Sequence, residues 1–459
     1  MKHHHHHHRS ATSSPSPSAP EISVVEPQRR FPSGYVNGVR PPHHLNNSQT
    51  KFCNPWPSFR YQALSQWVDF TARNIFSHTS PPDNVKSLIP IQTPTWGAGS
   101  GNESKAKATW LGHACYLVEY PTPSGASRGP RIIFDPVLSD HCAPVSVPAL
   151  KRFTDAPCSM DQLPPVDLIV LSHNHYDHTD LPTLRSITSN PAASPHVFVA
   201  LNNGAHISKA LEIPRARVHE LDWWDERAVR IMLPAAGSTT SDGAESASSS
   251  TTEKEVEAQL RVTCTPSQHV SGRGPFDRWG ALWAAWAIEE LLPPAASSDS
   301  DASQPPPQTQ TQTQSSASSP PGTSFAASSV WSTVGKKLFF AGDTGYRTVH
   351  DGEDEDKVPV CPAFAQVGER FGGMDAALLP IGAYGPRAMW SNLHASPSDA
   401  IRIMKDVKAK KGLAMHWGTW VLTTEPVMEP PELLRKECLK AGVQDDEFLV
   451  PGLGETAFF

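Results

Sequence analysis

A short run of metal-ligand side chains constrains this chain more than any other feature. Leu171-Ser-His-Asn-His-Tyr-Asp-His178 follows the apolar residues 166–171, a pattern typical of a buried strand that ends in a loop. Imidazole and carboxylate groups are ligands that zinc accepts. The spacing lets His173 and His175 bind one ion, while Asp177 and His178 bind a second. A polar turn that is rich in histidine by chance is the alternative, but imidazoles buried there without a ligand would be costly.

The run resembles the HxHxDH loop of the metallo-β-lactamase superfamily. The resemblance implies three further ligands downstream, and the chain offers His269 in Thr-Pro-Ser-Gln-His, Asp343 in Phe-Ala-Gly-Asp-Thr-Gly-Tyr and His416 in Met-His-Trp-Gly-Thr. Each follows a short apolar run, so we expect all ligands at one edge of a sheet, with Asp343 bridging two ions. Taken singly, His269 or His416 would more often be an ordinary core or surface histidine. Together, in this order, they indicate one open two-metal site.

Longer stretches narrow the resemblance to the branch of this superfamily that hydrolyses N-acylphosphatidylethanolamine as a phospholipase D. They span residues 52–459 and include Asn54-Pro-Trp-Pro-Ser58, Thr109-Trp-Leu-Gly-His-Ala114, Phe134-Asp-Pro-Val137, Leu163-Pro-Pro-Val-Asp167, Glu220-Leu-Asp-Trp-Trp224, Gly342-Asp-Thr-Gly-Tyr346 and Pro380-Ile-Gly-Ala-Tyr384. The resemblance implies an α/β fold, the metallo-β-lactamase αβ/βα four-layer sandwich. It also implies two zinc ions, with iron as the alternative metal, and hydrolysis of the lipid to N-acylethanolamine and phosphatidic acid.

The same resemblance suggests roles for residues beside the ligands. Asp135, in Phe-Asp-Pro, lies where the family keeps a carboxylate near the metals; it would orient the attacking water or a ligand histidine, and a turn cap is the alternative. His394, in Asn-Leu-His, lies where the family has a histidine facing the substrate phosphate, with a surface-loop histidine as the alternative. Tyr384 is expected to contact substrate with His394, and Asp177 to be catalytic as well as a ligand. His113 is expected to pack near the site and hold a loop.

Strand-like runs alternate with helices, as an α/β sandwich requires. The expected strands are residues 109–119, 131–134, 166–171, 197–201, 260–264, 281–288, 337–341, 376–380 and 412–415. Ser396-Pro-Ser-Asp399 predicts a helix start, with an N-cap serine, a proline at the first helical position and an acid at the third. A second helix is expected from about residue 431 to Ala441, closed by Gly442.

The composition divides the chain into one domain and several segments that are poor in apolar residues. Residues 3–8 are six histidines of an affinity tag, which is excluded from any metal argument. We expect residues 1–50 to be the tag and a disordered N-terminal segment, and residues 51–459 to be one hydrolase domain. Inserts at about 235–257 and 291–332 are rich in Ser, Thr, Pro, Ala and Gln, which predicts disorder because they cannot bury enough apolar surface.

Charge and cysteine content exclude some partners and compartments. The formal net charge of −7 gives no support for nucleic-acid binding, which usually shows as a clustered basic face. Seven cysteines, an odd number without a CxxC motif, predict an intracellular, reducing compartment. No apolar stretch of 18 residues occurs, so we expect a soluble chain or a peripheral membrane protein. The tag replaces the native start, so the organelle stays open, the mitochondrion included; a homodimer is open as well.

An aromatic segment, residues 52–78, is the expected route of substrate entry. It contains Trp56, Trp67 and Phe70 among polar residues, which suits either a helix at a bilayer surface or one that packs on the sandwich. The expected partner is a phospholipid substrate at a membrane surface. The main alternative is another hydrolase of this fold, a lactonase or a phosphodiesterase with a soluble substrate, which would need a polar or basic cleft. A non-enzymatic scaffold is disfavoured because every ligand position is filled.

Overall fold

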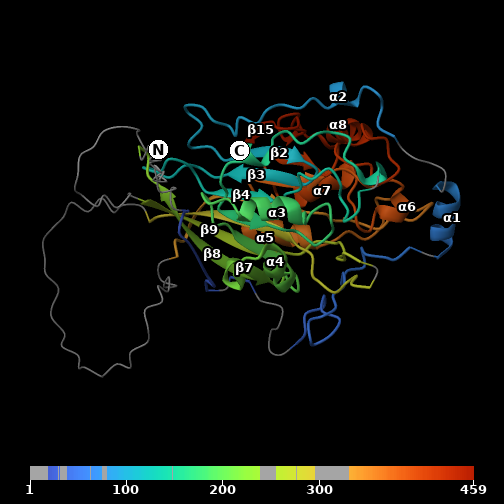
Figure 1. The fold of residues 1–459 in the computed structure, drawn as a ribbon. Coiled ribbons are helices and arrows are strands. Elements are labelled where there is room, and N and C mark those ends of the chain that lie inside the picture. The colour runs from blue at the N-terminus through green and yellow to red at the C-terminus, as the bar shows by residue number, and fades with distance from the viewer. Residues whose placement is uncertain are drawn as a thin grey trace, which may run out of the picture.

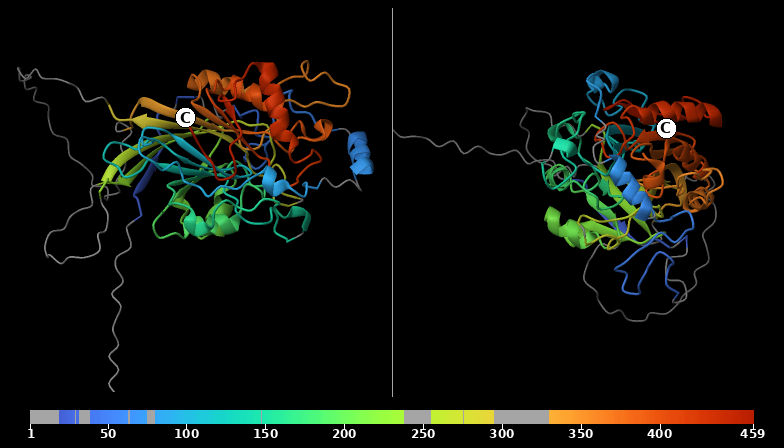
Figure 2. Two further views of the ribbon diagram at one scale, coloured as in Figure 1. Left: turned by 90° about the horizontal axis from the view of Figure 1, so that it is seen from above. Right: turned by 90° about the vertical axis from the view of Figure 1, so that its right-hand side faces the viewer.

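The computed structural model of the chain describes residues 19–28, 30–31, 39–62, 64–74, 80–146, 148–237, 255–274, 276–294 and 330–459. In this part of the chain two mixed β-sheets lie face to face, and helices cover their outer faces (Figure 1). Seen from above, the helices of the C-terminal third lie on one side of the paired sheets, and two helices from the middle of the chain lie on the other (Figure 2). The predicted four-layer αβ/βα sandwich is confirmed.

The larger sheet has eight strands in the order β1-β8-β9-β10-β11-β12-β13-β14. They are β1 (Ile22–Val25), β8 (Glu226–Pro234), β9 (Glu255–Thr265), β10 (Ala285–Leu292), β11 (Thr333–Phe340), β12 (Ala376–Pro380), β13 (Gly412–Met415) and β14 (Phe448–Leu449). Neighbours from β1 to β11 pair antiparallel, and those from β11 to β14 pair parallel.

The smaller sheet has seven strands in the order β15-β2-β3-β4-β5-β6-β7. They are β15 (Thr456–Phe458), β2 (Lys107–Gly112), β3 (Cys115–Glu119), β4 (Arg131–Phe134), β5 (Leu168–Val170), β6 (His196–Ala200) and β7 (Val218–Leu221). Neighbours from β15 to β4 pair antiparallel, and those from β4 to β7 pair parallel.

Helices complete the outer layers. They are α1 (Leu64–Asn74), α2 (Val85–Leu88), α3 (Leu181–Thr188), α4 (Gly204–Leu211), α5 (Ala363–Phe371), α6 (Arg387–Trp390), α7 (Pro397–Asp406) and α8 (Glu429–Ala441). The expected start of α7 is confirmed, because the Ser396 side chain accepts from the Asp399 amide and Asp399 accepts from the Ser396 amide. Helix α8 ends at Gly442, whose φ of 67° lies in the left-handed region that glycine adopts without strain.

Two apolar cores hold the layers together. Between the sheets, Phe134 of β4 and Phe340 of β11 have ring centroids 4.7 Å apart. Between the smaller sheet and helices α3 and α4, Val197 and Val199 of β6 join a second cluster. Phe198, the residue between them, belongs to the first cluster. Successive side chains of a strand point to opposite faces, so a strand buried on both sides reads as a continuous apolar run.

Five strands end at the same edge of the sandwich. The residues that follow them are Asp135 after β4, His173 after β5, His269 after β9, Asp343 after β11 and His416 after β13. The parallel pairings of β4 with β5, of β11 with β12 and of β12 with β13 bring the carboxyl ends together. The predicted convergence of the ligands at one sheet edge is confirmed.

The predicted domain boundary is wrong for part of the N-terminal segment. Residues 1–18, 29 and 32–38 lie outside the described residues, but Ile22–Val25 forms β1 and pairs antiparallel with β8. The Arg30 guanidinium then reaches the buried carboxylates of Glu226 and Glu289. A strand of four residues among proline and serine gives little sequence signal; its stability comes from the sheet edge it covers.

The predicted bounds of the two inserts and of several strands also differ from the observed ones. Most of the first insert and most of the second lie outside the described residues, but residues 255–257 belong to β9 and residues 291–292 to β10. The single strand expected at 109–119 is two strands, because Gly112 (φ 102°) and His113 (φ 50°) reverse the chain between β2 and β3. The prediction also missed β7, β8, α3 and α4.

Candidate metal centre

Three imidazoles meet at the first candidate ion position. Nε2 of His173 lies 2.8 Å from Nδ1 of His175, and Nε2 of His269 lies 3.4 Å from the same atom. His173 and His175 come from the loop after β5, and His269 comes from the end of β9. Three imidazole nitrogens thus face one another. A cation that all three nitrogens bind would satisfy this arrangement.

A carboxylate and two imidazoles meet at the second position. Oδ2 of Asp177 lies 3.3 Å from Nε2 of His178 and 3.8 Å from Nε2 of His416. Nε2 of His113 approaches the same carboxylate oxygen to 2.9 Å. The carbonyl oxygen of His113 also accepts a hydrogen bond from the backbone amide of His416. His113 therefore ties the β2–β3 turn to two predicted ligands, the loop-holding role expected from the sequence.

Asp343 lies between the two groups. Its Oδ1 is 2.9 Å from Nε2 of His416, and its Oδ2 is 3.2 Å from Nε2 of His178. The same Oδ2 is 3.8 Å from His269 and 4.0 Å from His173, which belong to the first group. The structure thus brings all seven predicted ligands together, with Asp343 in the bridging place.

The unsatisfied atoms of this cluster fit divalent cations. Nε2 of His178, Nε2 of His416 and Oδ1 of Asp343 are buried. Their short distances to one another's groups lack the angles of hydrogen bonds, so none of the three atoms has a hydrogen-bond partner among the described residues. Buried polar atoms of this kind are costly unless they bind something. Although burial opposes the charge, Asp343 and Asp177 raise the pKa of His416 to about 9. Protons and metal ions therefore compete for the same nitrogen atoms, and binding of a metal would release protons.

Asp135 reaches one ligand of each group. Its fully buried carboxylate lies 2.7 Å from Nδ1 of His178 and accepts from both the amide and the hydroxyl of Ser172. The Ser172 hydroxyl in turn lies 2.8 Å from Nδ1 of His173. Holding Nδ1 in this way would leave Nε2 of both histidines available to bind a cation. Asp135 thus holds two of the predicted ligand histidines, which fits one of its two expected roles. That role and its action on water stay predictions.

The two predicted substrate-contacting residues differ in their surroundings. Nδ1 of His394 lies 3.9 Å from Oδ2 of Asp343, and burial lowers the pKa of His394 to about 4. Its imidazole is therefore uncharged at neutral pH and borders the centre. The Tyr384 hydroxyl donates to Glu429 at 2.6 Å, and burial together with this bond holds its pKa far above the usual range. Its contact with substrate stays a prediction.

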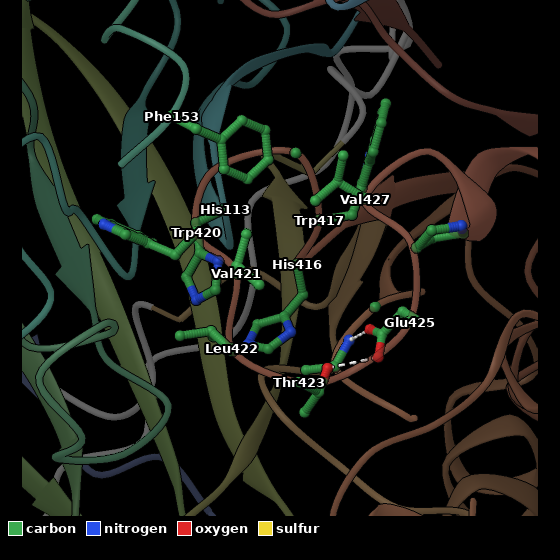
Figure 3. A pocket seen from close by; sticks show the side chains of 14 residues that line it. His113, Phe153, His416, Trp417, Trp420, Val421, Leu422, Thr423, Glu425 and Val427 are labelled. Carbon is green, nitrogen blue, oxygen red and sulfur yellow. Dashed lines mark hydrogen bonds between the residues drawn. The ribbon is translucent and has the colours of Figure 1, made fainter. Parts of the chain in front are cut away.

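A pocket of about 30 Å³ opens beside the second position (Figure 3). His113 and His416 line it together with the apolar side chains of Phe153, Trp417 and Trp420. Figure 3 also shows the Thr423 hydroxyl donating to Glu425, which holds the loop on the opposite wall. The wall of this pocket is thus formed mainly by aromatic and aliphatic groups.

One supporting residue had no signal in the sequence. The Arg273 guanidinium donates to the carbonyl oxygens of Asn174 and Thr179, each at 3.0 Å, and lies 3.9 Å from the centroid of the Tyr176 ring. It therefore braces both ends of the ligand loop. A lone arginine after His269 has no spacing that marks it, so only the folded structure identifies it.

A second group of histidine and aspartate lies outside the centre. We call His43, His44 and Asp222 the clasp. Nε2 of His43 is 2.7 Å from Oδ1 of Asp222, and Nε2 of His44 is 2.9 Å from Oδ2. Each oxygen of Asp222 thus faces one imidazole nitrogen, a pairing that protons on the two imidazoles satisfy without a cation. His43 is hydrogen-bonded to Asp222 and stacks on Trp223, while His44 lies at ion-pair distance from the second oxygen of the same carboxylate.

A sequence model of the β-lactamase superfamily domain matches residues 130–293 and 304–417, more than half of the chain. The N-acyl-phosphatidylethanolamine-hydrolyzing phospholipase D 1 of Caenorhabditis elegans is 27% identical over 388 residues, which cover 83% of each chain. The corresponding mitochondrial enzyme of Saccharomyces cerevisiae is 25% identical over 447 residues, 89% of this chain and 75% of that one. These matches confirm the resemblance to that branch.

Among solved structures, the isothiocyanate hydrolase from Delia radicum gut bacteria is similar with a TM-score of 0.44 and 16% identity. It covers 77% of this chain and 99% of its own. The metallo-β-lactamase fold protein YhfI from Bacillus subtilis has a TM-score of 0.34 and 14% identity, and covers 77% of this chain and all of its own.

Proposed function

The chain belongs to the β-lactamase superfamily and has its metal-binding fold, and on that premise we propose that it is a metal-dependent phospholipase D. The proposed reaction is hydrolysis of N-acylphosphatidylethanolamine to N-acylethanolamine and phosphatidic acid. The observation that carries the proposal is the bridging place of Asp343 between two ligand groups, a geometry suited to hydrolysis of phosphodiesters. The names of the worm and yeast relatives support the choice of substrate.

The residues of the centre have separate tasks in this reaction. Two divalent ions, zinc or in part iron, would when bound lower the pKa of water and neutralise charge that develops on the phosphate. Asp135 keeps His178 and, through Ser172, His173 in the orientation that binding requires. His394, uncharged and beside Asp343, can donate a hydrogen bond to a phosphate oxygen.

The bonds that change are those of one phosphodiester. The oxygen of a water molecule bonds to phosphorus, and the bond from phosphorus to the ethanolamine oxygen breaks. A proton from the water passes to that oxygen as N-acylethanolamine leaves. No covalent intermediate with the chain is required, and the oxygen taken from water stays in phosphatidic acid.

Helix α1 provides the surface that would contact a lipid bilayer. Trp67 and Phe70 pack edge-on against Trp390 of α6, each with ring centroids 6.3 Å apart. The helix therefore lies beside the loop that carries His394, at one end of the molecule (Figure 1). Leu64 and Val68, by contrast, are 80% and 62% exposed. One side packs on the domain while the other presents apolar side chains, as interfacial helices do.

We propose that the chain acts at a membrane surface as a peripheral protein inside the cell. Among the described residues, no helix is long and apolar enough to cross a bilayer. The yeast relative carries "mitochondrial" in its name, which makes the mitochondrion the first organelle to examine. Of the two roles considered for residues 52–78, Trp56 serves packing, because it stacks on Trp223 with centroids 5.4 Å apart.

The test is an assay of the metal-loaded, tag-free chain against N-acylphosphatidylethanolamine in vesicles, run in water enriched in ¹⁸O. Mass spectrometry should detect N-acylethanolamine and phosphatidic acid, with one ¹⁸O in the phosphate. A lactone and a nucleotide phosphodiester serve as comparison substrates. Brisk cleavage of either, with no N-acylethanolamine released, would overturn the substrate and leave the metal centre standing.

A further inference from the structure

A segment that precedes α1 crosses the metal-bearing edge of the sandwich. We call residues 52–62 the strap. It hydrogen-bonds to three loops that carry predicted site residues: Asn54 and Ser58 bond to the loop of His269, Arg60 bonds to Thr348 after Asp343, and Gln62 bonds to Met389 before His394. The strap thus joins ligand loops from different parts of the chain without supplying a ligand itself.

The contact with His269 is reciprocal. The Asn54 amide nitrogen donates to the His269 carbonyl at 2.8 Å, and the His269 backbone amide donates to the Asn54 side-chain oxygen at 3.2 Å. Asn54 is buried, so water does not replace these bonds without rearrangement. The ring is held as well, because Nδ1 of His269 donates to the carbonyl of Leu393 at 3.0 Å. Nε2 therefore points toward His175.

Gln268 extends this bracing to the neighbouring loops. Its side-chain oxygen accepts from the Ser58 hydroxyl at 2.6 Å, which turns its amide nitrogen toward the carbonyl of Asn392 at 3.0 Å. Its backbone amide donates to the Thr344 hydroxyl, and its carbonyl accepts from Gly345. Ser58 of the strap thus fixes the orientation of a side chain that links the loops of His269, Asp343 and His394.

We propose that Asn54 is a positioning residue for the metal centre, and that the strap determines how firmly the group of His173, His175 and His269 retains its ion. The proposal rests on the metal centre of the proposed function and not on its lipid substrate. His269 is the one histidine of that group from outside the ligand loop, so closure of the group depends on where its backbone lies. The second group has no bond to Asn54 among the described contacts.

Zinc release from the tag-free, zinc-loaded chain tests this. Excess 4-(2-pyridylazo)resorcinol takes up the metal, and its colour records the release of each ion with time. For Asn54→Ala we expect one of the two ions to leave about 10- to 100-fold faster, as losses of groups that orient metal ligands typically do. The other ion should leave at the wild-type rate. Asn46→Ala is the matched control, because Asn46 bonds only within its own turn, to Thr50.

A second variant provides an independent test if Asn54→Ala does not fold. Ser58→Ala removes one hydroxyl and should accelerate release of the same ion by a smaller factor. Thermal unfolding of the metal-free proteins separates positioning from general stability. Wild-type release of both ions from both variants would overturn the proposal. Equal acceleration of both ions, with a parallel fall in metal-free stability, would make the strap merely structural. A wild-type chain that binds no zinc would remove the centre and this inference with it.

Discussion

Two buried groups of histidine and aspartate differ in whether their members satisfy one another. In the clasp, the two oxygens of Asp222 each face one imidazole, at 2.7 and 2.9 Å. In the metal centre, Asp343 faces five imidazoles at 2.9 to 4.0 Å. Imidazole also faces imidazole there, because Nε2 of His173 lies 2.8 Å from Nδ1 of His175. The same residue types thus form a closed hydrogen-bonded unit in one place and an open donor set in the other.

Residue type alone therefore does not make a metal site. Two imidazoles and one carboxylate satisfy one another through protons, so the clasp needs no cation. In the metal centre, five imidazoles crowd around the one carboxylate of Asp343 and nitrogen faces nitrogen, an arrangement that cations satisfy. We therefore expect metal in the centre and none in the clasp.

The largest effect is expected for loss of a central ligand. Asp343→Asn or His173→Ala should reduce turnover on the order of 10³-fold or more, because each removes a ligand on which activation of water depends. The fold should persist, since these side chains lie outside the apolar cores. Steady-state kinetics and circular dichroism check both parts. Near-normal turnover in Asp343→Asn would show that Asp343 is no ligand.

A smaller loss is expected when the support behind the ligands is changed. Asp135→Asn places an amide that both donates and accepts where three donors now converge from Ser172 and His178. Metal affinity and activity should fall about 10- to 100-fold. Competition with a chelator measures the affinity. Unchanged affinity with reduced activity would instead indicate that Asp135 acts on water rather than on the histidines.

The clasp should affect stability and not metal content. Asp222→Asn should lower the free energy of unfolding by about 1–3 kcal/mol, the cost of disturbing buried hydrogen bonds. Although burial opposes its charge, the bonds from His43 and His44 hold the pKa of Asp222 well below its usual range. This stabilisation is present above the unfolded pKa of about 3.9 and is lost as the pH falls below it.

Urea denaturation across pH measures that contribution. The difference between wild type and Asp222→Asn should shrink below about pH 4, as the unfolded chain takes up the proton that the clasp disfavours on Asp222. Lys86→Ala, which removes an exposed ion pair with Asp155, is the control and should change little. A difference that does not shrink below about pH 4 would contradict a clasp held by an ionised Asp222.

Helix α1 should matter only at an interface. Leu64→Ser with Val68→Ser should lower turnover on vesicles a few fold, because both side chains are exposed and apolar. Turnover of a short-chain soluble phosphodiester should not change. Equal losses on both substrates would mean that these residues serve the fold, as Trp56 does.

The smallest effect is expected for the two long inserts. Strand β9 enters from the first insert and spans eleven residues, about 35 Å, before the chain reaches the loop of His269. Replacing residues 239–253, or residues 296–328, with a short Gly/Ser bridge should leave activity within about threefold. The bridges start inside these bounds because residues 255–257 and 291–292 are strand. Loss of folding would contradict the interpretation of the inserts as loops.

The sequence predicted what is local or shared with a known family. Four ligands stand in one loop, and the capping box at Ser396 is contained in four residues. The clasp could not be predicted, because His43 and Asp222 are 179 residues apart and nothing in their spacing suggests contact. From the sequence, Asn54 could be identified only as part of Asn54-Pro-Trp-Pro-Ser58, one of the stretches that resemble the phospholipase D branch. Its role depends on the backbone of His269, 215 residues away.

Metal analysis of the tag-free chain, purified without chelator, tests the contrast between the two groups most directly. We predict about two divalent ions per chain in the wild type and in Asp222→Asn, and fewer in Asp343→Asn. A wild-type content near zero would contradict the two-metal centre. Three ions in the wild type, falling to two in Asp222→Asn, would show that the clasp is a metal site after all.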